Sequence, residues 1–516
     1  MSSSNIWILA AIVVYLLVTI VIGVVYSRKG AGSGTAEFYL GGRRLHPLVT
    51  AMSAEASDMS SYLLMGLPGL AYLCGVAEVG WTVIGLAVGT YLNFLFVAKR
   101  LRVYSNSVGA RTVPEFFANR YEDKKHVLSF IAALIILVFF VPYTASGFKA
   151  VGTLFNSLFG WDYHISMIIG AVVIIGYTVL GGFLAVSTTD LIQSIVMTAA
   201  LILIILFGIS QAGGLSAVWA NAKALPGYLS LTQGYDPATG SAGVFGAFPI
   251  ASTLAWGLGY FGMPHILLRF MAIRNPSEIR LSRRIASVWV VISMAIAVFI
   301  GIIGYSVSVS GRIPFLQGSS ESETIIIRMA DLMSKNGVFF AIVAGVIMAG
   351  ILAATMSTAD SQLLAAASSM SEDMLHDFFG LRVSPKTSML IARLTVVAVA
   401  VIGVLLAWNP NSSVFRVVSF AWAGFGAAFG PVMLLALFWK RSTRSGAICG
   451  MIAGAAMVFI WKFLIAPVGG VLAIYELLPA FVIALIVNVV VSLAAGSPSP
   501  SMRSTFDSVR AESREA

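Results

Sequence analysis

The sequence predicts an all-α polytopic membrane protein with about thirteen transmembrane helices. The 516-residue chain is 58% hydrophobic and only 10% charged, whereas soluble proteins carry about 25% charged residues. Apolar runs that can cross a bilayer, at about 20 residues each, recur along the whole length. Most of the 32 lysine and arginine residues lie in alternate connecting segments, which is typical of a chain that obeys the positive-inside rule.

The apolar runs give the order of the spans, and the basic segments give their orientation. The first run ends at Arg28 and Lys29 and follows neutral residues, so we expect an uncleaved first span. The basic segments place the N-terminus outside and the C-terminus in the cytoplasm, in the inner (cytoplasmic) membrane of a cell. The predicted spans are 6–27, 47–75, 79–98, 127–156, 163–182, 188–210, 246–268, 286–309, 336–370, 388–408, 414–438, 446–466 and 474–495.

Two spans are interrupted in corresponding positions. Span 2 contains SAEASDMSS at 53–61, and span 7 contains WGLGYFGMP at 256–264. Such a pair indicates an inverted-repeat transporter with a central site, so spans 2–11 are expected to form two five-helix repeats. The expected division is 1–46 (first span and inner loop), 47–210 (first repeat), 211–438 (outer loop and second repeat), 439–495 (peripheral spans) and 496–516 (cytoplasmic tail).

The segments outside the spans carry two further expectations. Residues 310–335 are predicted to contain a short amphipathic helix at the outer surface, and the polar tail is predicted to be disordered. Neither segment resembles a soluble signalling or nucleic-acid-binding module.

No enzyme motif is present. The sequence lacks a Walker-type phosphate loop, HExxH, CxxCH and GxSxG, and its two cysteines, Cys74 and Cys449, lie far apart. We therefore expect a transporter driven by an ion gradient, with no organic cofactor, no nucleic acid and no obligatory protein partner. A charge that moves down a potential of 100 mV supplies about 2.3 kcal/mol.

The carboxylates of span 2 indicate a cation site, because charged groups inside a membrane must find partners within the protein. Asp58 is a direct cation ligand, a nearby attracting charge or a cap of the broken helix, and the residues do not separate these roles. Glu55 lies one turn earlier and can share its face, or turn away to pair with Lys149 or a loop arginine.

In span 9, Ala354, Ser357, Thr358 and Ser361 lie at i, i+3, i+4 and i+7 and share one face. Adjacent hydroxyls with exposed carbonyls suit a hard monovalent cation; the alternative is that the hydroxyls bond to their own helix or join neighbouring helices.

In span 7, Trp256 and Tyr260 flank glycines. This pattern suits either a small, compact solute or close helix packing, because glycine lets another backbone or a ligand approach.

Four other charged residues are candidates. Asp190, at the predicted start of span 6, is either an N-cap or a functional group. Arg43 is either a positive-inside anchor or a gate element. Lys149 and Asp360 are in-membrane charges and therefore functional hypotheses; Asp360 either contributes to a second cation site or pairs with Lys149 or another buried group.

The sequence resembles the sodium/solute symporter family through nearly its whole length. The matching stretches are FYLGGRRLHPLVTAMSAEASDMSSYLLMGLPG, FVPYTASG, GGFLAVSTTDLIQS, WGLGYFGMPHILLRFM, ILAATMSTADSQLL and WAGFGAAFGPV. The resemblance implies thirteen spans with an outer N-terminus and a LeuT-like five-plus-five inverted repeat in spans 2–11. It also implies sodium-coupled symport by alternating access.

The resemblance also implies the residues of the site. A sodium ion is expected at backbone or hydroxyl oxygens of the cation-site residues, with Asp58 and Ser57 nearby; these are Ala56, Met59, Ala354, Ser357 and Thr358. The solute is expected at Tyr143, Trp256, Tyr260, Pro264 and Ser361. Arg43 and Asp190 match positions that influence coupling or gating.

The motifs around Asp58 and Tyr260 resemble those of the proline-carrying branch, so the expected solute is L-proline. The alternatives are another amino acid, a monocarboxylate, pantothenate or a sugar acid in the same fold, and a proton-coupled carrier. Five residues depart from that branch: Glu55 and Ser61 replace glycines, Ser361 a cysteine, Asp360 a serine and Lys149 an apolar residue.

Overall fold

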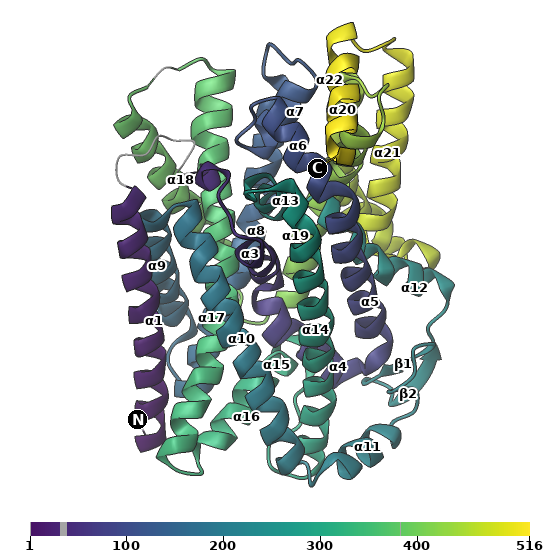
Figure 1. Cartoon of the computed structure of the whole chain (residues 1–516). Coiled ribbons are helices and arrows are strands. Elements are labelled where there is room, and N and C mark those ends of the chain that lie inside the picture. The colour runs from purple at the N-terminus through teal and green to yellow at the C-terminus, as the bar shows by residue number, and fades with distance from the viewer. Residues whose placement is uncertain (1, 31–38, 382, 516) are drawn as a thin grey trace.

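The computed structural model describes residues 2–30, 39–381 and 383–515. Long helices run side by side and form one bundle (Figure 1). The N-terminus, α11 (Leu215–Lys223) and the hairpin of β1 (Gln233–Asp236) and β2 (Ser241–Val244) lie toward one end of this bundle. At the other end lie α7 (Val113–Arg120) and α22 (Pro500–Glu515). These two ends correspond to the predicted outer and inner sides.

Most predicted spans are single long helices. They form because apolar residues favour burial in lipid or protein and a helix satisfies its own backbone hydrogen bonds. These helices are α1 (Ser3–Gly30), α5 (Val76–Leu92), α8 (Val127–Phe159), α9 (Tyr163–Gly181), α10 (Phe183–Gln211), α14 (Ile279–Val309), α17 (Val338–Ser368), α18 (Pro385–Leu406), α19 (Val414–Phe438), α20 (Arg444–Ile460) and α21 (Leu477–Ala494).

The two spans that were predicted to be interrupted are broken. The first consists of α3 (Pro47–Ser61), a π-helical segment η2 (Tyr62–Gly66) and α4 (Leu67–Cys74). The second consists of α12 (Ala247–Leu254), a 3₁₀ segment η4 (Ala255–Phe261) and α13 (Pro264–Ala272).

Ten helices in the described part of the chain are long and apolar enough to cross a membrane. The apolar stretch of α9 is shorter, at Tyr163–Gly176, and the two broken spans fall outside a count of continuous helices. Each of the thirteen predicted segments overlaps helical structure, which confirms the all-α polytopic class. The count of thirteen crossings stays a prediction.

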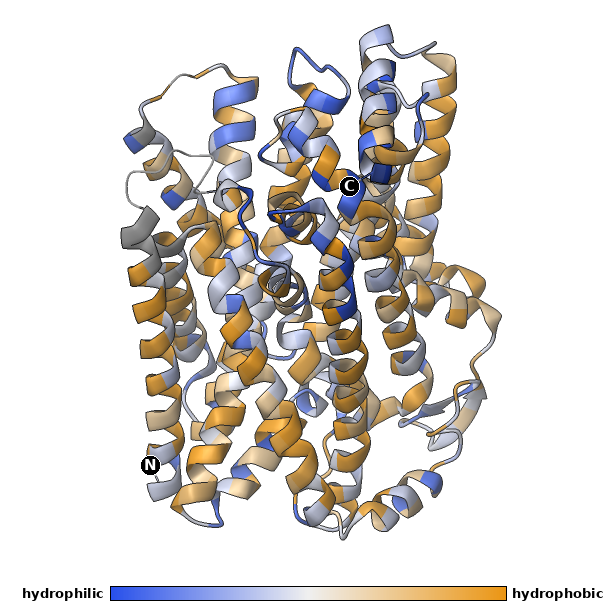
Figure 2. Ribbon diagram, viewed as in Figure 1, coloured by the Kyte–Doolittle hydropathy of each residue, from blue (hydrophilic) through white to orange (hydrophobic). Residues whose placement is uncertain are grey.

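Polarity in the bundle is inverted relative to a soluble protein. Peripheral helices expose apolar side chains; Val14 and Leu206 are 60% and 63% exposed, and the outer helices are hydrophobic along their length (Figure 2). In contrast, every residue from 50 to 69 is buried, including Glu55 and Asp58. The polar stretch of span 2 is therefore in the core, where α3 packs against α10, α13, α14 and α17.

The connecting segments contain short elements. The largely buried helices α6 (Lys99–Ser107) and α7 (Val113–Arg120) connect two spans. A later connection contains α11 (Leu215–Lys223) and the antiparallel strands β1 (Gln233–Asp236) and β2 (Ser241–Val244), which pair Gln233 with Val244. A short helix is present in 310–335 as predicted, α16 (Ile325–Ser334), after the short α15 (Gly318–Ser322). Its expected place at the surface is wrong, because α16 packs into the bundle and none of its residues is exposed.

The prediction of a disordered tail is wrong. Residues Pro500–Glu515 form α22, which buries Phe506 and Val509 against the bundle. The ring of Phe506 lies 4.8 Å from the guanidinium carbon of Arg100 and 5.4 Å from that of Arg120. A few apolar residues at helical spacing and cation–π contacts therefore order a segment whose overall composition is polar.

Candidate ion and solute site

The helix break in span 2 is at Ser60. Its backbone has φ 47° and ψ −168°, whereas its neighbours are helical. This region is essentially restricted to glycine and costs of order 1–3 kcal/mol for other residues, so the surrounding structure must hold it. The Ser60 hydroxyl accepts a hydrogen bond from the Tyr62 N–H at 3.1 Å, which restarts the chain as a helix.

The break in span 7 frees carbonyl groups that side chains of other helices satisfy. Asn93 Nδ2 donates to the Tyr260 carbonyl at 3.0 Å, and Trp422 Nε1 donates to the Trp256 carbonyl at 2.8 Å. A Cβ on Gly257 would lie 2.2 Å from the Gly85 carbonyl oxygen. Of the two explanations for the glycine pattern, the structure therefore shows close packing of η4 against α5.

The predicted cation face of α17 meets α3 directly. Ser357 Oγ donates to the Ala56 carbonyl at 2.8 Å and lies 3.1 Å from the Ala354 carbonyl, which also accepts from Thr358 Oγ1 at 3.2 Å. Four of the five predicted sodium ligands are thus brought together. Met59, one turn after Ala56, is buried at the adjoining cavity.

Asp58 is held between two tyrosines. Tyr260 Oη donates to Asp58 Oδ2 at 2.5 Å, and Tyr143 Oη donates to the Asp58 carbonyl at 3.0 Å. Ser57 Oγ donates to the Ala54 carbonyl of its own helix at 3.0 Å. Asp58 therefore joins the two broken spans to α8, and its carboxylate contacts a residue of the predicted solute site.

A small cavity of about 10 Å³ lies beside Asp58, which is room for about one water molecule. Tyr143 and Trp256 line it, as the sequence predicts for the solute site. Tyr62, Met294 and Trp422 also line it; the sequence analysis did not identify them. A solute as large as an amino acid requires these walls to move.

Aromatic rings surround Trp256. Its ring centroid lies 5.4 Å from those of Tyr62 and Phe415 and 5.1 Å from that of Tyr475. These contacts close the cavity with large, rigid groups. Spacing along the chain gives no sign of them, because the partners come from three other segments.

Three residues predicted for the solute site, Tyr260, Pro264 and Ser361, do not line this cavity. Tyr260 instead contacts the Asp58 carboxylate. Pro264 is buried at the first position of α13. Ser361 lies one turn after Ser357, and its Oγ accepts a hydrogen bond from Arg269 Nη2 at 2.6 Å.

Arg269 and Asp190 form a buried ion pair beside the cation face. Their side chains are 1% and 0% exposed, and Arg269 Nη2 lies 3.1 Å from Asp190 Oδ2. Ser53 Oγ donates to the same Asp190 oxygen at 2.6 Å. The N-cap interpretation of Asp190 is wrong, because α10 begins seven residues earlier at Phe183.

Arg269 is a residue that the sequence analysis missed by assigning it to an inner loop. The sequence does contain an indication of a functional role, because Arg269 is an arginine in the apolar continuation of a broken span. The positively charged guanidinium of Arg269 donates a hydrogen bond to Ser361 Oγ, and this hydroxyl donates in turn to Asp360 Oδ1 at 3.3 Å.

Arg43 lies in the connection that leads to α3. Its Nη1 donates to the Met271 carbonyl at 2.6 Å, and its Nη2 donates to the Ala110 carbonyl at 2.6 Å. Its φ of 57° follows two left-handed glycines. Burial, with the nearby Arg102, lowers the pKa of Arg43 to about 10, so it stays charged at neutral pH.

The predicted partners of Lys149 are wrong. Lys149 Nζ pairs with Glu323 Oε2, not with Glu55 or Asp360. Glu55 is 1% exposed, and its Oε2 has no hydrogen-bond partner in the described structure. Glu323, in the connection between α15 and α16, was not identified from the sequence because nothing near it in the chain indicates its partner.

Comparison with known sequences supports the same interpretation. A model of the sodium:solute symporter family matches residues 38–454. The sodium/proline symporter of Staphylococcus aureus (strain USA300 / TCH1516) is 40% identical over 511 residues, covering 98% of this chain and 96% of that protein. The sodium/proline symporter of strain NCTC 8325 / PS 47 has the same identity and coverage. These relatives are transporters and not enzymes.

Comparison with solved structures shows the LeuT-like fold. A substrate-bound, outward-open Na⁺-coupled sialic acid symporter matches with a TM-score of 0.78 at 17% identity, covering 96% of this chain and 99% of that one. MhsT in complex with L-phenylalanine matches with a TM-score of 0.54 at 13% identity, covering 88% and 99%. At these identities the likeness concerns the fold alone.

Proposed function

Because the chain belongs to the sodium:solute symporter family, we propose that it couples sodium entry to the uptake of L-proline by alternating access. Sodium-coupled symport in a cell membrane follows from the family. The identity of the solute as proline is a more specific assignment than the family. It is supported by the 40% identity to sodium/proline symporters along almost the whole chain.

The contact between Ser357 and Ala56 carries the proposal. The 2.8 Å hydrogen bond from Ser357 Oγ to the Ala56 carbonyl brings oxygens of α17 and α3 together at a buried point. A sodium ion between them replaces this hydrogen bond with ion–oxygen contacts from both helices. Such an ion is favoured only while the helices are close, so its binding shifts the population toward one arrangement of the bundle.

Asp58 connects this cation site to the solute site. Its carboxylate lies within a turn of Ala56 and Met59 and is hydrogen-bonded to Tyr260 of the second broken span. In the proposal, the negative charge attracts sodium, and Tyr260 transmits the position of α3 to η4. Proline then occupies an enlarged form of the cavity lined by Tyr143 and Trp256.

Proline suits walls of this kind. Its ring is compact and apolar and packs on aromatic faces, while its carboxylate and ammonium groups need polar partners. The two broken spans supply backbone groups that the helices do not use themselves. Pro264 and Ser361 are retained as proposed solute-site residues that approach the solute after rearrangement, and Arg43 and Asp190 as coupling or gating residues.

Uptake by the purified chain in sealed vesicles tests the proposal. Labelled proline should accumulate with an inward sodium gradient, and excess unlabelled proline should compete. If another amino acid, monocarboxylate or sugar acid competes while proline does not, the solute assignment is wrong. Uptake that is unchanged when choline replaces sodium, and that follows a proton gradient, refutes the assignment of sodium.

A further inference from the structure

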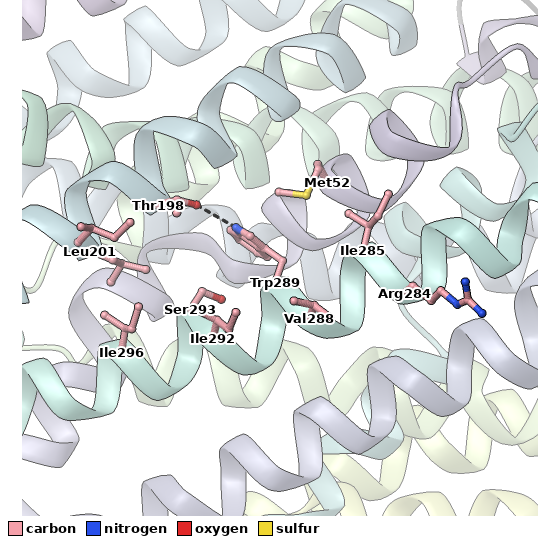
Figure 3. Close-up of a pocket in the computed structure, with 11 residues that line it drawn as sticks. Met52, Thr198, Leu201, Arg284, Ile285, Val288, Trp289, Ile292, Ser293 and Ile296 are labelled. Atoms are coloured by element: carbon pink, nitrogen blue, oxygen red, sulfur yellow. Dashed lines mark hydrogen bonds between the residues drawn. The ribbon is translucent and has the colours of Figure 1, made fainter.

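A lateral groove lies between α10 and α14, away from the ion and solute site. Its volume is about 520 Å³, within the roughly 300–1,000 Å³ range of small-molecule sites. Thr198 and Leu201 of α10 form one wall, Ile285 and Ile292 of α14 form the other, and Met52 of α3 lies at its base (Figure 3). The groove opens on the apolar surface, where Val288 is 59% exposed.

The groove has the length of one lipid leaflet. Its α14 wall runs from Arg284 to Ile296, which is roughly 18 Å at about 1.5 Å per residue. Half of a hydrocarbon core of about 30 Å is roughly 15 Å. Apart from Thr198, Ser293 and Arg284, the wall side chains are apolar or aromatic, and Trp289 Nε1 is already hydrogen-bonded to Thr198 Oγ1 at 2.9 Å.

One end of the groove is positively charged. Arg284 lies at this end and Arg280 one turn before it; both are exposed, and neither has an ion-pair partner in the described part of the chain. The third arginine of this turn, Arg283, instead stacks on Tyr91 at 5.1 Å. Two exposed arginines at i and i+4 lie on one face of the helix and can both contact one anionic group.

We propose that this groove binds an anionic phospholipid. One acyl chain lies along α14 between Ile285 and Ile296, and the phosphate is held by Arg280 and Arg284. A basic group at the end of an apolar groove, on the side that the positive-inside rule places in the cytoplasm, complements such a lipid in both charge and depth. A zwitterionic amino acid suits the walls less well, because the hydroxyls of Thr198 and Ser293 are already hydrogen-bonded within the protein.

The base of the groove connects the proposed lipid site to the residues beside the cation face. Met52 precedes Ser53, whose hydroxyl is hydrogen-bonded to Asp190 and Arg269 beside the cation face. An acyl chain that packs on Met52 therefore supports α3 about two turns before its break at Ser60. The lipid site does not depend on which solute is carried.

Quenching of tryptophan fluorescence by brominated lipid tests the site. The full chain in phosphatidylcholine vesicles is titrated with phosphatidylglycerol brominated on its acyl chains, and the Trp289→Phe variant identifies the part of the signal that comes from the groove. We expect saturable quenching of Trp289 by phosphatidylglycerol at low mole fraction, and much weaker quenching by brominated phosphatidylcholine.

Charge variants make the test specific. The double variant R280Q/R284Q should weaken the apparent affinity for phosphatidylglycerol by about 30-fold, at about 5-fold for each arginine. The matched control K386Q/R393Q removes two exposed basic residues from α18 and should leave the affinity unchanged. Equal quenching by both lipids, or no effect of R280Q/R284Q, overturns the proposal. So does crosslinking between cysteines placed at the groove mouths of two copies, because it would show that a second chain covers the groove.

Discussion

Lys149 Nζ lies 3.3 Å from Glu323 Oε2, and each side chain is only 2% exposed. The same carboxylate accepts hydrogen bonds from Ser413 Oγ at 2.7 Å and from the backbone N–H groups of Val414 at 3.0 Å and Phe415 at 3.1 Å. Glu323 thus joins the connection between α15 and α16 to α8 and caps the first turn of α19, where a negative charge is favoured. Phe415, whose backbone N–H belongs to this cap, also packs its ring against that of Trp256, with 5.4 Å between the centroids.

This arrangement predicts unequal effects of the two partners. Glu323→Ala leaves Lys149 buried without a counter-charge and removes the cap of α19, so it should destabilise the protein by about 3–5 kcal/mol. Lys149→Met should be milder, because Glu323 keeps its three helix-terminal donors. The apparent unfolding temperature of the purified variants in detergent measures the difference. If Lys149→Met lowers the unfolding temperature as much as Glu323→Ala, the cap contributes nothing. Ser320→Ala is the control, because it removes a neutral contact of Lys149 and an exposed hydrogen bond to the Pro410 carbonyl but leaves the ion pair and the cap in place.

The cation face predicts a sodium defect without a matching proline defect. Ser357→Ala removes the hydroxyl that joins the two helices, and Thr358→Ala removes its neighbour. Each should raise the sodium concentration for half-maximal uptake about 10-fold, the equivalent of about 1.4 kcal/mol. Thr355→Ala is the matched control, because this buried hydroxyl bonds only to Ile351 of its own helix. Sodium titrations of uptake at saturating proline compare the three variants. An equal rise in the half-maximal sodium concentration in all three would argue against a localised site.

The 2.5 Å contact between Asp58 and Tyr260 predicts coupled effects. Asp58→Asn should raise the sodium requirement at least about 10-fold, because it removes the charge beside the proposed site. Tyr260→Phe leaves the carboxylate without this donor and should give a smaller shift in the same direction. In the double variant the effects should not add, since both act through one contact. Additive shifts in a double-mutant cycle of sodium titrations would contradict the role assigned to Tyr260.

The positions of the spans were predictable because hydropathy is a local property that lipid imposes on each helix. Both breaks were also predictable, since polar residues and glycine–proline clusters in apolar runs mark them locally. The exact position of the break, at Ser60, was not predictable. A serine there does not favour φ 47°; the contacts of the packed core impose it, and those come from distant parts of the chain.

The partners of the buried charged residues were not predictable either. Asp190 was identified as a candidate, but the sequence left a helix cap and a functional group open, because it does not contain the information that Arg269, 79 residues away, lies beside it. The partner of Lys149 is 174 residues away. Composition predicts that an in-membrane charge has a partner, whereas only the fold identifies the partner.

Gly259 predicts a steric requirement in the second broken span. A Cβ at this position would lie 1.9 Å from Trp422 Nε1, the atom that donates to the Trp256 carbonyl. Gly259→Ala should therefore displace Trp422 and reduce both stability and proline uptake. Gly176→Ala in α9 is the control, because nothing lies within 4 Å of its added methyl group, and removing a helical glycine should stabilise by up to about 1 kcal/mol. Thermal unfolding and uptake of both variants test this, and a Gly259→Ala variant with wild-type values would contradict the close packing.

The docking of α22 predicts protection of the tail from protease. Phe506 is 3% exposed and lies against Arg100 and Arg120, so Phe506→Ala should weaken docking by about 3–5 kcal/mol. Cleavage by trypsin after Arg510 then proceeds through a more populated open form, and its rate should rise at least about 10-fold. Ser508→Ala, at an exposed position of the same helix, should leave the rate unchanged. Equal and fast cleavage of the wild-type chain and both variants would mean that α22 is not docked in solution, and the original expectation of a disordered tail would then stand.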